Sequence, residues 1–477
     1  MIAKRSLLRS KALNAVVILI SSIMLSLSAL ALSDATSRLR TGIFVPLAAL
    51  VVVIMAVIKQ EVVLLYLLAV IWVMAITTGG FSAIPLTGGL TAWELLLYVG
   101  VAVAMALGRI SLLRRSADNQ VAEGRGGLEG VWIGLLLVLF GSLAVLGKTN
   151  SEGYGNFRYA AINPLLVFIL ATSLIKRSEQ LVRFSIALCI GSLAVLVMQV
   201  IPGFDMSTGR LQLINRLNVF GDQYGVQANR LGLWINSCMP LILCYVVGAK
   251  KRVLRWGSLL LYLALAVVLF LTVSRGCQIA ALVSSVLVLL VMSRVGYRRR
   301  AWAIIGLLAA IMLVVLVFNR SWSVLNPSFL RTGDLESRLE LWRLSIGLVT
   351  ANPLGIGYGA LVPITGMWEH NMFILVMNGG GLIGLLGLVV FFISYISACI
   401  RAMRRSEGIL RLLCIAALGS AVSLILTGMS MEILYPTYPE AALLMLALGF
   451  CAVKLAYRIP AAGVQSSIVI SPKVYNG

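Results

Sequence analysis

Apolar runs of about 20 residues recur along almost the whole of this 477-residue chain. A helix of that length crosses the roughly 30 Å of hydrocarbon in a bilayer. Because water is absent there, the backbone must satisfy its own hydrogen bonds, and helices do so. Only 12% of the residues are charged and 60% are hydrophobic, whereas soluble proteins carry about 25% charged residues. The sequence therefore predicts an all-α, polytopic transmembrane helical bundle.

The apolar runs predict about 12–14 spans in a single integral membrane domain over residues 1–477. The first span follows a basic stretch and lacks a small-residue cleavage site, so we interpret it as an anchor rather than a cleaved signal peptide. The predicted spans lie near residues 14–32, 43–58, 62–76, 91–108, 131–147, 160–175, 184–201, 230–248, 257–273, 277–293, 301–318, 371–398, 412–430 and 440–456.

The distribution of Lys and Arg predicts the orientation. If the N-terminus lies in the cytoplasm, the inner segments hold 27 of the 39 Lys and Arg residues, among them the tail 457–477. This asymmetry is typical of cytoplasmic loops. It explains most of the net charge of +22 through topology and contact with lipid headgroups. Nucleic-acid binding is not indicated, because the basic residues are dispersed and no aromatic platform accompanies them.

The outer side nevertheless carries more arginine than this topology requires. Arginine can grip phosphate oxygens through two parallel hydrogen bonds. For any single arginine, pairing with a loop carboxylate is an equally good interpretation. The outer arginines from residue 210 onward are Arg210, Arg216, Arg230, Arg275, Arg320, Arg331, Arg338 and Arg343.

Two shorter stretches contain polar candidates. The predicted outer loop 203–229 holds Arg210 and Arg216 and ends in Asn229 at the mouth of a span, a pattern of low specificity by itself. Farther along, Thr272–Gly276 forms a tight hairpin that places Arg275 at or just under the membrane surface, where an ionisable group is a functional candidate. Ser274 is predicted to cap the following helix.

The longest polar interruption is a second predicted outer loop, 319–370, which we expect to contain short helices. Arg338, Trp342 and Ser345 fall on roughly one face of the first of them. Asn352–Pro353 is predicted to end that helix. The side chains predicted to lie on the membrane are Leu339, Leu341 and Ile346.

The end of this loop holds the single histidine of the chain. Gly355–Gly359 is predicted to be a flexible loop, and it lacks the strand, helix and lysine of a nucleotide-binding loop. Glu369, His370 and Asn371 then open the next span. There the helix dipole and nearby arginines favour the neutral imidazole, which a general base requires. The alternative is a histidine that only caps the helix.

Several chemistries are not indicated. With one histidine, no Asp-x-Asp pair and no Cys–His cluster, we expect no metal site and no cofactor. The seven cysteines lie within or at the ends of spans and are interpreted as small apolar residues. The glycines of Gly379–Gly387 predict close helix packing or a helix break.

Together these motifs resemble the O-antigen ligase and O-antigen polymerase superfamily (the WaaL and Wzy type). The resemblance covers roughly residues 205–400. It rests on Ser274–Gly276, on Arg338 four residues before Trp342, on Asn352–Gly357 and on His370–Asn371 before a glycine-rich span.

The resemblance implies a metal-independent, inverting glycosyltransferase of the bacterial inner membrane, with its active site facing the periplasm. Such proteins move a glycan whole from undecaprenyl diphosphate to a sugar hydroxyl. The acceptor is either lipid A–core, in a ligase, or the next lipid-linked repeat, in an O-antigen or exopolysaccharide polymerase. His370 would be the catalytic base, and Arg210, Arg275, Arg338 and Asn371 would bind substrate. Further candidates are Arg216, Asn229 and Glu369.

A lipid-linked oligosaccharide flippase or other transporter is the alternative from a different class. Its charges should lie at mid-membrane, whereas those of this chain are predicted at the outer edge. A purely structural membrane protein is the third interpretation. The residues do not distinguish ligase from polymerase, nor do they name the sugar.

Overall fold

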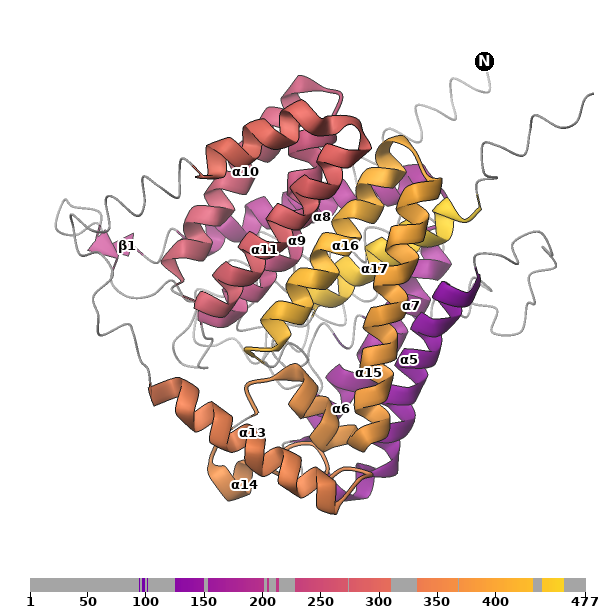
Figure 1. The fold of residues 1–477 in the computed structure, drawn as a ribbon, viewed down its shortest axis with the longest axis vertical. Coiled ribbons are helices and arrows are strands. Elements are labelled where there is room, and N and C mark those ends of the chain that lie inside the picture. The colour runs from indigo at the N-terminus through magenta and orange to yellow at the C-terminus, as the bar shows by residue number, and fades with distance from the viewer. Residues whose placement is uncertain are drawn as a thin grey trace, which may run out of the picture.

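The computed structural model describes residues 94, 97, 98, 101, 125–149, 153–200, 204–205, 212–213, 228–272, 274–309, 333–367, 369–431 and 440–458. Over these residues the chain is a bundle of helices (Figure 1). A short antiparallel pair joins β1 (Phe204–Asp205) to β2 (Gln212–Leu213) within the predicted loop 203–229. The predicted spans near 14–32, 43–58 and 62–76 lie outside the described residues.

The bundle confirms the predicted helical membrane architecture. Its helices are α5 (Arg125–Ala144), α6 (Gly153–Phe157), α7 (Asn163–Leu174), α8 (Ser178–Val200), α9 (Ala228–Gly248), α10 (Arg252–Leu271), α11 (Arg275–Met292), α13 (Gly333–Ala351), α14 (Val362–Thr365), α15 (Met372–Arg405), α16 (Gly408–Gly428) and α17 (Glu440–Ala456). Short turns are the 3₁₀ turn η2 (Leu146–Lys148) and the π-helical turns η3 (Arg158–Ile162) and η6 (Ser293–Tyr297).

Six of the described helices are long and apolar enough to cross a membrane. They are Gly153–Leu174, Leu231–Gly248, Arg252–Phe270, Arg275–Ala309, Met372–Arg405 and Gly408–Gly428. Two shorter apolar helices are Leu128–Ala144 and Ala442–Ala456. The run Arg275–Ala309 contains a bend at Val295 and Gly296, where the predicted spans near 277–293 and 301–318 meet.

The centre of the bundle is formed by α9, α16 and α17, in which most of the described side chains are buried. By contrast, α10 and α11 expose large apolar side chains such as Leu260, Val267 and Ile279 on one face. Such a face suits contact with lipid hydrocarbon. Figure 1 shows α13 and α14 at the same end of the bundle as α6.

Glycines bring α15 into close contact with α5, and the two helices run side by side (Figure 1). A Cβ atom on Gly141 would lie 2.5 Å from the backbone oxygen of Gly380, and one on Gly387 would lie 2.7 Å from the nitrogen of Val138. Small residues allow such close approach of helices in a membrane. The predicted packing role of the glycine-rich stretch is therefore confirmed.

The same stretch also breaks α15. Gly381 has φ 63° and ψ −161°, outside the helical region. The break leaves the backbone oxygen of Asn378 without its helical partner, and this oxygen accepts the N–H groups of Ile356 and Gly357 at 2.9 and 3.1 Å. The N–H of Leu382 donates instead to the backbone oxygen of Pro353 at 2.9 Å. A loop that fills a helix break in this way satisfies backbone groups that lipid could not.

The prediction of a flexible loop at Gly355–Gly359 is therefore wrong. Gly355, Gly357 and Gly359 are buried, and each has a positive φ that favours glycine. A Cβ on Gly355 would lie 2.7 Å from the nitrogen of Gly381. The glycines are there because two stretches of backbone meet with no room for side chains.

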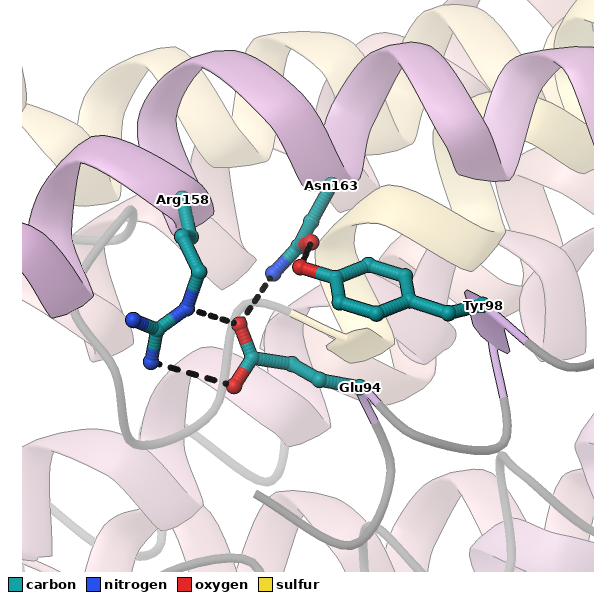
Figure 2. Close-up of polar contacts among 4 residues, drawn as sticks. All are labelled: Glu94, Tyr98, Arg158 and Asn163. Atoms are coloured by element: carbon teal, nitrogen blue, oxygen red, sulfur yellow. Dashed lines mark hydrogen bonds and ion pairs between the residues drawn. The ribbon is translucent and has the colours of Figure 1, made fainter. Parts of the chain in front are cut away.

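A buried ion pair was missed from the sequence (Figure 2). Glu94 is fully buried and accepts hydrogen bonds from Arg158 Nε at 2.9 Å and Asn163 Nδ2 at 3.1 Å. Tyr98 donates to Asn163 Oδ1 at 3.1 Å. Because breaking a buried pair leaves an uncompensated charge, this cluster fixes Glu94 and Tyr98 against the start of α7.

We expect Gly381→Ala to destabilise the protein. The backbone region that Gly381 adopts is essentially restricted to glycine and costs other residues of order 1–3 kcal/mol. In addition, a Cβ there would lie 2.3 Å from the carbonyl carbon of Leu354. Thermal unfolding of the protein purified in detergent would show a lowered Tm.

The matched control is Gly347→Ala, in the middle of α13, where a Cβ would meet nothing within 4 Å. Alanine should stabilise that helix by roughly 0.5–1 kcal/mol. Equal Tm changes for the two variants would contradict the role given to the break in α15.

Candidate functional site

The residues just after α16 form the point where several predicted site residues meet. Arg338 Nη1 donates to the backbone oxygen of Ser430 at 3.1 Å, and Asn371 Nδ2 donates to that of Met429 at 3.1 Å. The last carbonyls of a helix lack intrahelical partners and lie at the negative end of its dipole. They therefore suit a guanidinium group and an amide N–H.

Arg275 begins α11 next to the same place. A Cβ on Gly276 would lie 2.2 Å from Ser430 Oγ, so the start of α11 packs directly on the residue that binds Arg338. The side chain of Arg275 is exposed and that of Arg338 is partly exposed. Ser274 occupies the N-cap position, but its side chain makes no capping hydrogen bond, so that detail of the prediction is wrong.

Asn236 of α9 ties these elements together and was missed because it lies inside an apolar run. Its Nδ2 donates to the backbone oxygen of Cys277 at 2.8 Å and to Thr427 Oγ1 at 3.2 Å. The side chain is fully buried. One amide thus joins the start of α11 to the end of α16, below Arg275 and Ser430.

The side chain of Asn371 caps α15. Its Oδ1 accepts the N–H groups of Phe373 and Ile374 at 2.8 and 3.2 Å. The interpretation of His370 as the cap is therefore wrong, because His370 precedes the cap residue. His370 is partly exposed and has φ 50°, a left-handed conformation that is uncommon for a residue with a Cβ. This backbone conformation is intrinsically unfavourable, so the surrounding structure must hold it in place.

Glu369, on the other side of His370, points into the protein. Its carboxylate is fully buried, and Asn378 Nδ2 donates to its Oε1 at 3.1 Å. Its backbone oxygen accepts the indole N–H of Trp342 at 2.9 Å. Asn378 Nδ2 also lies 3.4 Å from Ser345 Oγ.

These contacts confirm that Arg338, Trp342 and Ser345 share one face of α13. The helix ends at Ala351, as the following Asn352–Pro353 predicts. Leu341 was predicted to lie on the membrane and is instead buried, 5% exposed. Its position, one residue before Trp342, turns it toward the protein along with Ser345 and Val349.

Tyr358 anchors the glycine-rich loop and was not predicted. Its hydroxyl lies 2.9 Å from Ser142 Oγ of α5, and its ring lies 6.4 Å from that of Phe157. Burial raises the pKa of Tyr358, and the nearby Glu369 carboxylate raises it further. The tyrosine is therefore a neutral hydrogen-bonding group that fixes the loop beneath Glu369.

The remaining candidates are placed as follows. Arg210 and Arg216 lie outside the described residues, and Asn229 lies in the first turn of α9. All seven cysteines are free and six are buried, as expected for small apolar residues. Within the described part of the chain, no three His, Cys, Asp or Glu side chains come together as metal ligands.

A comparison with protein families gives a match over residues 259–389 to the family described as O-antigen ligase. The matched region contains Arg275, Arg338, the glycine-rich loop and His370, but neither the loop 203–229 nor α16. A search of curated proteins gave no match. Over these residues the match supports the resemblance found in the sequence.

Proposed function

We propose that this protein transfers a glycan whole from undecaprenyl diphosphate to a sugar hydroxyl on the periplasmic face of the bacterial inner membrane. One observation carries the proposal: Arg338 and the cap residue next to His370 bind consecutive carbonyls, those of Ser430 and Met429. This arrangement supports a site in which Arg338 and His370 act on the same substrate.

The arginines would act on the donor. Diphosphate is a good leaving group, and hydrogen-bond donors placed where negative charge develops lower the barrier to its departure. Arg338 binds the backbone oxygen of Ser430, and Gly276, the residue after Arg275, packs on the hydroxyl of the same serine. Arg210 would add a third contact from the loop 203–229. These residues require no metal ion for the proposed reaction.

His370 would act on the acceptor. Its neutral imidazole takes the proton of the acceptor hydroxyl while that oxygen attacks the anomeric carbon of the donor. The bond from the anomeric carbon to the phosphate oxygen breaks, and undecaprenyl diphosphate leaves with the electron pair. A single direct displacement inverts the anomeric centre. Asn371 would position His370 through the helix cap.

The Glu94–Arg158 pair is the one observation that favours a transporter, because an ionisable group within a span is a functional candidate. Its geometry argues for a structural role. Arg158 Nε and Nη2 bind the two carboxylate oxygens at 2.9 and 3.4 Å, and Asn163 binds one of them (Figure 2). The pair also lies outside residues 259–389, which match the ligase family.

The periplasmic location predicts which introduced cysteines can be labelled in cells. Thr350→Cys, at an exposed position on α13, should react with an impermeant thiol reagent added from outside. Glu407→Cys, at an exposed position between α15 and α16, should react only after the membrane is opened. The unmodified protein is the control for its own cysteines. The reverse labelling pattern would show that the orientation is opposite to the predicted one and would contradict a periplasmic active site.

His370→Ala should lower the transfer rate by roughly 10²–10⁴-fold, because it removes the general base. His370→Asn should be equally inactive, since an amide does not accept the proton. Both variants should reach wild-type levels in the membrane, because Asn371 forms the helix cap. The measurement is transfer per folded protein with lipid-linked donor. Near wild-type transfer by His370→Asn would show that the histidine is not the base.

Arg338→Lys should lower transfer strongly, and so should Arg275→Lys, because lysine keeps the charge but loses the planar fork that binds two phosphate oxygens. The matched control is Arg343→Lys, at an exposed position on the same helix as Arg338, which should change transfer little. Donor binding to the purified variants should follow the same order. Equal transfer by all three variants would show that Arg275 and Arg338 have no special role in binding the diphosphate.

A further inference from the structure

Asn378 connects four segments of the site through one side chain and one carbonyl. Its Nδ2 contacts Glu369 at 3.1 Å and Ser345 of α13 at 3.4 Å. Its backbone oxygen binds the N–H groups of Ile356 and Gly357. The residue therefore joins α13, the glycine-rich loop, α15 and the turn that carries His370. It lies within the first part of α15, before the break at Gly381.

Asn378 is fully buried, and its Oδ1 has no hydrogen-bond partner among the described residues. Leaving a buried acceptor unsatisfied destabilises the folded protein. An apolar residue of similar size would avoid that cost and lose only the contacts of the amide N–H group. The orientation of Asn378 toward Glu369 and Ser345 thus has a cost in stability, which points to a functional reason for the amide.

The carboxylate that Asn378 holds belongs to the residue directly before His370. The backbone of His370 adopts φ 50°, a conformation that is unfavourable for a residue with a Cβ. It persists because both neighbours are anchored: Glu369 by Asn378 and Trp342, and Asn371 by its cap and Met429. Strained conformations are maintained only where the surroundings impose them.

We infer that Glu369 and Asn378 are positioning residues that set the direction of the His370 imidazole toward the acceptor. Glu369 acts through the backbone it fixes, since its own carboxylate is fully buried in the protein. Trp342 serves the same purpose through the carbonyl of Glu369. The inference rests on the proposed role of His370 as general base, and it adds three residues that do not touch the reacting atoms.

A pair of reciprocal substitutions tests the inference. Asn378→Asp places two carboxyl groups together and should lower kcat by roughly 10²-fold, the effect of moving a reacting group by about 1 Å. The KM for the lipid-linked donor should stay within about threefold, because arginines bind the diphosphate. Glu369→Gln keeps an acceptor oxygen for Asn378 and should have a smaller effect. Combining Glu369→Gln with Asn378→Asp restores a donor–acceptor pair and should recover most of kcat.

The matched control is Asn163→Asp, which likewise places a second carboxyl group beside a buried glutamate, Glu94, away from His370. It should lower the Tm and leave kcat per folded protein unchanged. If Asn378→Asp behaves like this control, Asn378 is only structural and the inference is overturned. Failure of the double variant to recover kcat would overturn it equally.

Trp342→Phe provides a second route if Asn378→Asp does not fold. It keeps the ring but removes the N–H that binds the carbonyl of Glu369, so kcat should fall with little change in the donor KM. Unchanged kcat in this variant would contradict the inference. Failure of the proposed function looks different, because His370→Ala itself would then retain transfer. If His370→Ala is inactive while Trp342→Phe keeps full kcat, only the positioning role is lost.

Discussion

The break in α15 is the constraint on which the rest of the site depends. A membrane helix cannot leave backbone groups unpaired in lipid, because no water is available to bind them. The break at Gly381 is therefore tolerated only because the loop that begins at Pro353 supplies the missing partners. Irregular backbone at membrane depth is typical of places where it is covered by protein or lines a cavity. The glycines of this loop serve backbone contact rather than nucleotide binding.

The arrangement of the site follows from this contact. The loop joins α13 to α14, so fixing its backbone against α15 also fixes the distance from α13 to the start of α15. Trp342 and Ser345 then reach Glu369 and Asn378, and Arg338 reaches the end of α16. Side chains distant in the sequence are brought together by contacts among backbone groups.

The sequence predicted those parts of the site that depend on local chemistry. The shared face of Arg338, Trp342 and Ser345 follows from helical periodicity, and the end of α13 at Ala351 follows from Asn352–Pro353. The contributions of Asn236, Tyr358 and Asn378 were not predictable, because single polar residues inside apolar runs carry no signal of their partners. The two carbonyls just after α16, those of Met429 and Ser430, could not be predicted at all, since every residue has a carbonyl.

Two arginines of this structure show how surroundings decide the role of one residue type. Arg158 binds the buried carboxylate of Glu94, which compensates its charge within the protein. Arg338 instead donates to the neutral carbonyl of Ser430, and among the described residues no carboxylate lies within ion-pair distance of it. A carbonyl fixes the direction of a guanidinium group without cancelling its positive charge. Arg338 can therefore be held in place and still attract an anion, whereas the charge of Arg158 is already used to join two segments. This difference, which the sequence alone does not reveal, is why we place the diphosphate beside Arg338.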